Sequence, residues 1–140
     1  MTDAPPPQGD YVPAARHGRF VFTAGMTSRM RGKATLLGTI GDDLDEYERR
    51  RAVRIAAQNA ADAVTSMLEP GETVTALMRL TVYLACAKEF TRHSVLADEA
   101  SSCLRERWSD AAVGARTAIG VSSLPGGQPV EVELVAIASE

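Results

Sequence analysis

Residues 115–138 read ARTAIGVSSLPGGQPVEVELVAIA, and this stretch decides the fold. Residues 115–122 are mostly small and apolar, and residues 130–134 alternate apolar with acidic side chains, as a strand with one buried face does. Between them, residues 124–129 hold two prolines and two glycines, which mark a turn. The sequence therefore predicts strands over 115–122 and 130–138, joined as a hairpin that folds about Gly126.

Arg116, Glu131 and Glu133 are the candidate chemical groups of this hairpin. Arg116 would face residues 134–136, which leaves its backbone roughly 10 to 17 Å from that of Glu131. An arginine at the start of an apolar strand either reaches solvent or binds an anion, and its planar guanidinium suits a carboxylate. The two glutamates share one face, where they either meet solvent or orient and deprotonate a water. The predicted spacing disfavours a salt bridge and favours a pocket for a small ligand and one water.

The rest of the chain alternates strands with two helices. Apolar residues at three- and four-residue steps predict a helix over 45–68, which Pro70 ends, and a second helix over 91–108. Strands are predicted at 11–16 and 19–24 around a turn at His17 and Gly18, at 35–37 within a loop, and at 75–85. This order predicts an α+β fold with a mainly antiparallel sheet and both helices on one face. No third layer remains to cover the other face, so we expect self-association.

Composition narrows the class of protein. The chain has 140 residues and a net charge of −3. This length favours one domain over 1–140, with a flexible lead over 1–9. No apolar run is long enough to cross a membrane and no signal peptide begins the chain, so the cytoplasm is the expected compartment. The acidic balance makes nucleic acid an unlikely partner. Cys86 and Cys103 are predicted to be reduced thiols, and no cysteine or histidine lies at metal-ligand spacing, so neither metal nor cofactor is expected.

Several segments resemble the RidA/YjgF family of reactive-intermediate deaminases. They are FVFTAG at 20–25, QNA at 58–60, ARTAIGV at 115–121, LP at 124–125 and VEVE at 130–133. The resemblance implies a chorismate-mutase-like fold, assembled as a homotrimer with its sites in clefts between subunits. Members hydrolyse small-molecule enamines and imines, such as 2-aminoacrylate and its imine tautomer, to 2-keto acids and ammonia without a cofactor.

The resemblance also implies roles for individual residues. Arg116 would bind the substrate carboxylate and Glu131 would position the attacking water. Tyr11 would reach in from a neighbouring subunit, and backbone groups of Gly25 and Ala118 would line the pocket. Because an imine carbon is already electrophilic, orientation and a held water suffice for its hydrolysis.

The chain departs from the archetypal pattern at several positions of the pocket. Asp10 stands where a proline precedes the tyrosine, Met26 stands where a glutamine follows the strand-end glycine, and Asp98 stands where asparagine is frequent. The loop over 26–43 is basic and longer than in the archetype. These changes leave two alternatives open: a tailoring enzyme or ligand-binding protein for a larger biosynthetic intermediate, and a ribonuclease or translation inhibitor.

Overall fold

An antiparallel hairpin begins the sheet of this protein, whose computed structural model describes residues 4–112 and 114–140. Strand β1 (Ala14–His17) pairs with β2 (Phe20–Thr23), so that His17 lies opposite Phe20 across the turn. Gly18 supplies the positive φ of 61° that the turn requires. The predicted hairpin is confirmed, with a first strand that starts three residues later than expected.

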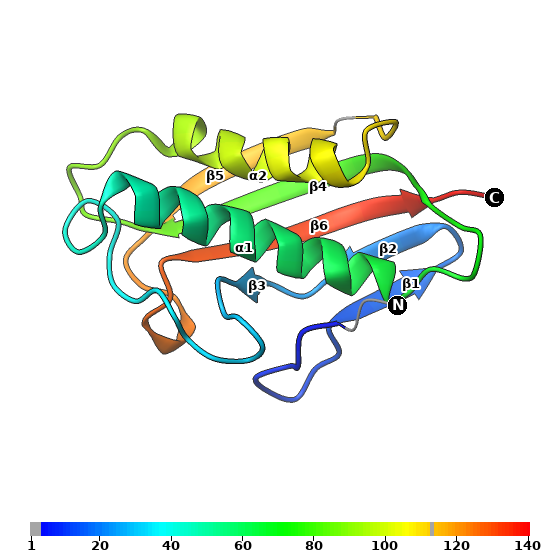
Figure 1. Cartoon of the computed structure of the whole chain (residues 1–140), viewed down its shortest axis with the longest axis horizontal. Coiled ribbons are helices and arrows are strands. Elements are labelled where there is room, and N and C mark those ends of the chain that lie inside the picture. Colours follow the sequence, from blue (N-terminus) through cyan, green and yellow to red (C-terminus); the bar gives the residue numbers. More distant parts are fainter. Residues whose placement is uncertain (1–3, 113) are drawn as a thin grey trace.

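The sheet is mixed, in the order β1-β2-β6-β4-β5. The strands that complete it are β3 (Met26–Thr27), β4 (Val74–Ala85), β5 (Ala115–Val121) and β6 (Val130–Ala138). Strand β6 is antiparallel to its three partners β2, β3 and β4, whereas β5 runs parallel to β4 (Figure 1). The mainly antiparallel sheet is therefore confirmed, and one parallel pair adds to it.

Two details of the predicted topology are wrong. Strands β5 and β6 do not pair as a hairpin, because β4 lies between them and the 3-10 turn Pro125–Gly127 only carries the chain past it. Residues 35–37 form no strand; the short strand of that loop region is β3. The chain bends on both sides of this segment, since Gly32 and Gly38 both take a positive φ and Lys33 pairs back with Met30 across the first bend.

Helices α1 (Glu46–Thr65) and α2 (His93–Arg107) lie side by side on one face of the sheet, as predicted (Figure 1). Helix α1 begins at a capping box, in which Asp45 accepts from the backbone N–H of Glu48 and the Glu48 carboxylate accepts from that of Asp45. Every second residue of β6, from Val130 to Ala138, is buried on the helix side. The core therefore lies between the helices and the sheet.

The other face of the sheet carries large apolar side chains. Phe20 and Phe22 lie in register with Ile137 and Val135 of β6, and they are 47% and 49% exposed. Ile119 of β5 shares this face and is 45% exposed. The helix-free face of the sheet thus exposes apolar side chains, which is the feature from which we expected self-association.

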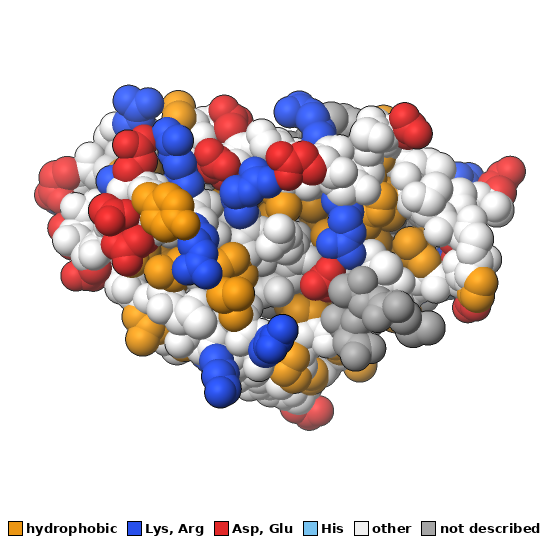
Figure 2. Space-filling model, in the orientation of Figure 1, with side chains coloured by type: hydrophobic (Ala, Val, Ile, Leu, Met, Phe, Trp, Pro, Cys, Tyr) orange, Lys and Arg blue, Asp and Glu red, His pale blue; other side chains and the backbone are white. Residues whose placement is uncertain are grey.

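The helix face is instead covered by charges of both signs (Figure 2). Ion pairs join α1 to α2, including Arg54 to Glu99 at 3.5 Å and Arg107 to Asp62 at 2.8 Å. Such interspersed charges do not form a continuous basic surface for a nucleic-acid backbone on this face. Within the described residues, no helix is long and apolar enough to span a membrane.

Candidate functional site

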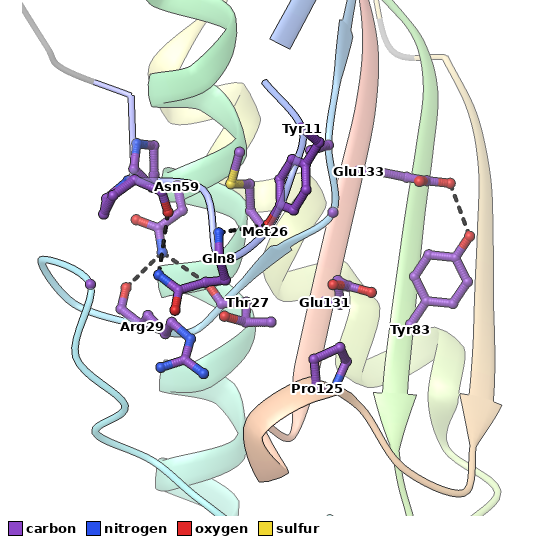
Figure 3. A pocket seen from close by; sticks show the side chains of 15 residues that line it. Gln8, Tyr11, Met26, Thr27, Arg29, Asn59, Tyr83, Pro125, Glu131 and Glu133 are labelled. Carbon is purple, nitrogen blue, oxygen red and sulfur yellow. Dashed lines mark hydrogen bonds between the residues drawn. The ribbon is translucent and has the colours of Figure 1, made fainter. Parts of the chain in front are cut away.

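A cavity of about 430 Å³ opens at the sheet edge where β3 ends beside β6 (Figure 3). Its walls come from the N-terminal segment, the β2–β3 connection, the basic loop, α1, β4 and β6. They are formed by Pro5, Pro6, Gln8, Tyr11, Ala24, Gly25, Met26, Thr27, Arg29, Gly32, Asn59, Tyr83, Pro125, Glu131 and Glu133. The expected flexible lead over 1–9 lies partly outside the described residues, and three residues of its described part line this cavity.

Glu131 forms the inner wall of the cavity from the helix-free face of β6. Its carboxyl group lies against Gly25, where an added Cβ would come within 2.6 Å of Glu131 Cδ. Burial, and then the charge of Glu133, raises the pKa of the Glu131 carboxyl above its ordinary value. The group is thus more basic than a free carboxylate, which suits it to exchange a proton with a bound water.

Glu133 lies two residues further along the same face and is held by Tyr83 of β4. The Tyr83 hydroxyl donates to Glu133 Oε1 at 2.9 Å. This hydrogen bond, together with burial, raises the pKa of Tyr83, so the phenol stays protonated as the donor. One of the two neighbouring carboxylates therefore has a fixed partner, whereas no hydrogen bond to Glu131 is found among the described residues.

Tyr11 and Gly25 lie on the same cavity wall as Glu131 within one chain. The Tyr11 hydroxyl accepts from the backbone N–H of Gln8 at 3.1 Å, which folds the N-terminal segment over the cavity. Met26 is buried and contributes an apolar side chain to the same wall. Three predicted site residues, Tyr11, Gly25 and Glu131, are therefore brought together without a second copy.

Asn59 of α1 anchors the basic loop to this cavity. Its amide donates to the carbonyl oxygen of Thr27 at 2.9 Å and to that of Arg29 at 2.7 Å. The Arg29 side chain lines the cavity beside these bonds (Figure 3). The sequence pointed to the basic loop but did not single out Arg29 as a cavity residue, because a loop has no periodicity that shows which side chain turns inward.

Arg116 lies on the opposite face of the sheet from Glu131. It is in register with Leu80, which is buried under the helices, whereas Glu131 is in register with Tyr83 on the helix-free face. Two strand spacings and three residues along the strands separate the backbones of Arg116 and Glu131, which is about 14 Å. The predicted convergence of the two side chains does not occur within one chain.

The Arg116 guanidinium is instead bound to one side of α2. Nη1 donates to Asp98 at 2.7 Å and to Ser101 at 3.0 Å, and Nη2 donates to the hydroxyl and the carbonyl of Ser94 at 2.8 and 3.1 Å. These bonds use four of the five guanidinium N–H groups. Ala118, on the same face of β5, packs against the core and does not line the cavity around Glu131.

A second polar pair lies at the far end of β4, in an open cleft of about 560 Å³. Cys86 Sγ and His93 Nε2 are 3.4 Å apart. Gly120 makes this contact possible, since a Cβ there would lie 2.5 Å from the imidazole nitrogen and 2.9 Å from the sulfur. Burial raises the pKa of the Cys86 thiol, so it rests protonated. The sequence spacing had given no sign of this contact.

No cluster of three or more histidine, cysteine or acidic side chains that could hold a metal ion occurs in residues 4–112 and 114–140. The chemistry available in the cavity is therefore that of a basic carboxylate, a second carboxylate, hydroxyl groups and one arginine.

Comparison with known proteins identifies the family. The family model described as Endoribonuclease L-PSP matches residues 1–138. Protein TCP17 of Trypanosoma cruzi is 27% identical over 129 residues, which cover 91% of this chain and 80% of that protein. The structure of Atu1372 from Agrobacterium tumefaciens, a protein of unknown function, has a TM-score of 0.86 at 24% identity and covers 93% of this chain and 82% of that one.

The structure of E. coli TdcF with bound serine has a TM-score of 0.69 at 20% identity, over 99% of this chain and 96% of that one. At such identities the two solved structures establish the fold alone, and the match over 1–138 establishes the family. The chain therefore belongs to the Endoribonuclease L-PSP family, which is the RidA/YjgF family expected from its closing strands.

Proposed function

We propose that this protein is a cofactor-free hydrolytic deaminase, which converts reactive imines and enamines to 2-keto acids or related carbonyl compounds and ammonia. The observation that carries the proposal is the Glu131 carboxyl, which lines the cavity against Gly25 and whose pKa is raised by burial and by Glu133. TdcF, whose fold is shared, was solved with bound serine, an amino acid of the size of the simplest imino acids.

The chemistry requires the same carboxylate to take up and return a proton twice. Glu131 accepts a proton from water as the water oxygen attacks the electrophilic carbon of the C=N bond, and it passes this proton to the imine nitrogen, which gives a carbinolamine. The carboxylate then accepts the carbinolamine hydroxyl proton as the C=O bond forms and passes it to nitrogen as the C–N bond breaks, so that ammonia leaves and Glu131 is again a carboxylate. A carboxyl group whose pKa is raised by burial returns a proton more readily than an ordinary carboxyl group, which suits Glu131 to this double role.

Recognition of the substrate carboxylate is assigned to Arg116 of a neighbouring copy in a homotrimer. Arg116 and Ala118 of one chain lie on the other face of the sheet from Glu131, away from the cavity of their own chain, and we therefore assign them to the cavity of a neighbouring subunit. Tyr11 and Gly25 act with Glu131 of their own chain in this arrangement. The exposed phenylalanines of β2 and Ile119 support the assembly, because they need a cover.

The test is release of ammonia and keto acid from 2-aminoacrylate and 2-iminobutyrate generated in situ. Wild type should accelerate both, Glu131→Gln should lose most of the acceleration at an unchanged fold, and Arg116→Ala should raise KM most. Glu89→Gln is the matched control, since Glu89 is an exposed glutamate that lines no described cavity. A well-folded wild type without acceleration would overturn the proposal, and a monomer in light scattering would overturn the shared site.

The alternatives make different predictions in the same experiments. A binding protein for a larger intermediate would show ligand affinity without turnover. A ribonuclease would cleave RNA at low salt and lose this activity when the basic loop residues are neutralised. The two carboxylates in the cavity and the net charge of −3 repel phosphates, so RNA is the weaker candidate.

A further inference from the structure

Arg29 is the one cationic side chain among the described residues that line the cavity around Glu131. Glu131 and Glu133 supply the negative charge of that cavity. Within residues 4–112 and 114–140, no carboxylate lies at ion-pair distance from Arg29, whereas eight ion pairs join other groups. Among the described residues of one chain, Arg29 is therefore the cationic group with which an anion in this cavity can pair.

The surrounding structure holds the backbone of Arg29 and leaves room for its guanidinium. Asn59 holds the Arg29 carbonyl at 2.7 Å, which pins the backbone of the loop to α1. On the other side, a Cβ at Gly126 would collide with Nη2 of Arg29, so the glycine of the turn after β5 leaves room for the charged group. The backbone of Arg29 is thus held at the cavity wall, and its half-buried guanidinium, for which no hydrogen bond is found among the described residues, is open to an anion in the cavity.

The cavity is large for a three-carbon imine. Its volume of about 430 Å³ falls within the range of pockets that enclose drug-sized ligands. A second hollow of about 410 Å³ continues from it beneath the N-terminal segment. The two share Pro5, Pro6, Arg29, Gly32 and Asn59, so Arg29 lies where they join.

We propose that Arg29 binds a second acidic group of the substrate, so that the protein acts on imines of dicarboxylic amino acids. This inference rests on the proposed deaminase function and deepens it. The α-carboxylate of the substrate binds Arg116 of the neighbouring copy. Its side-chain carboxylate is repelled by Glu131 and Glu133 and binds the guanidinium of Arg29. Arg29 takes no part in the bond changes; it selects and orients the substrate.

The experiment compares two five-carbon imines that differ only at the far end. 2-Iminoglutarate and 2-iminopentanoate are generated in situ by amino-acid oxidases, and kcat/KM for hydrolysis is measured with semicarbazide as competing trap. Wild type should favour 2-iminoglutarate by about tenfold or more, the usual worth of a hydrogen-bonded charge pair. Arg29→Gln should lower kcat/KM for 2-iminoglutarate by about tenfold more than for 2-iminopentanoate, and so remove this preference. Lys33→Gln, in the same loop but on neither cavity wall, should retain it.

Each other outcome has a defined meaning. Equal hydrolysis of both imines by wild type would overturn the role of Arg29 and leave the deaminase standing. An equal loss for both substrates in Arg29→Gln would also overturn it, because the residue would then bind the α-carboxylate that both share. If wild type hydrolyses neither, the proposed function fails, and titration calorimetry with 2-oxoglutarate and 2-oxopentanoate decides: dicarboxylate binding lost in Arg29→Gln supports the site, and no preference overturns it.

Discussion

Gly25 is the position where one added methyl group should disable the proposed site while the protein stays folded. A Cβ there would lie 2.6 Å from Cδ and 2.8 Å from Oε1 of Glu131, whereas non-bonded carbon atoms prefer about 3.5 to 4.0 Å. In Gly25→Ala the carboxyl group must therefore move by roughly 1 Å. The backbone itself accepts alanine, because Gly25 is not among the glycines with a positive φ.

A displacement of this size has unequal effects on activity and stability. Misplacing a reacting group by about 1 Å can cost about a hundredfold in rate, so kcat/KM for 2-aminoacrylate should fall by about that factor. The strained Glu131 rotamer costs about 0.5 to 1.5 kcal/mol, and alanine offsets about 0.4 to 1 kcal/mol by restricting the unfolded chain. The melting temperature should therefore change by only a few degrees.

A double-mutant cycle separates this mechanism from a general disturbance. In Glu131→Ala the colliding atoms are absent, so adding Gly25→Ala should not lower activity further, and it should raise stability by about 0.4 to 1 kcal/mol, which is what restricting the unfolded chain contributes. The reasoning would be refuted if Gly25→Ala lowered activity by the same factor in both backgrounds. It would also be refuted if the single variant kept full activity, since the position of the Glu131 carboxyl would then not matter.

Three further variants test single features. Because burial raises the pKa of Glu131, the native state holds the carboxyl proton more tightly than the unfolded chain does. The unfolding free energy should therefore decline as pH rises from 4.5 through the raised pKa. Glu131→Gln should remove this decline, and its melting temperature at pH 7 should lie above that of wild type. Asp45→Ala removes the cap of α1 and should lower the unfolding free energy by about 0.5 to 2 kcal/mol in urea titrations. Gly120→Ala should cost about 1 to 3 kcal/mol by the same assay, because its Cβ meets Cys86 and His93.

The elements of the fold were predictable wherever periodicity was strong. The three- and four-residue steps gave both helices, and Asp45 marked the start of α1 within one residue. The pairing of β5 was missed because the proline and glycine turn after it suggested a hairpin. The strand–helix–strand order β4-α2-β5 carried the opposite signal, since such a crossover joins parallel strands, and tertiary packing followed it.

The site was predictable in part for a related reason. Alternation shows which residues of one strand share a face, so Glu131 and Glu133 could be placed together. It does not relate the faces of two strands that never pair, and Arg116 and Glu131 belong to such strands. Arg29 lies in a loop, where its inward position depends on the contact of Asn59 with the loop backbone.

The ion pair between Arg116 and Asp98 competes with the carboxylate of a substrate for Arg116. Asp98 is 68% exposed, and such pairs contribute at most about 1 kcal/mol, so a substrate carboxylate can displace it at small cost. The displacement nevertheless subtracts from the affinity of every substrate whose α-carboxylate is bound by Arg116. A second acidic group bound by Arg29 adds affinity that Asp98 does not contest, because Asp98 does not line that cavity. The two effects are therefore independent: Asp98→Asn should raise kcat/KM for 2-iminopentanoate and for 2-iminoglutarate by a similar factor, and the preference for two acidic groups should remain.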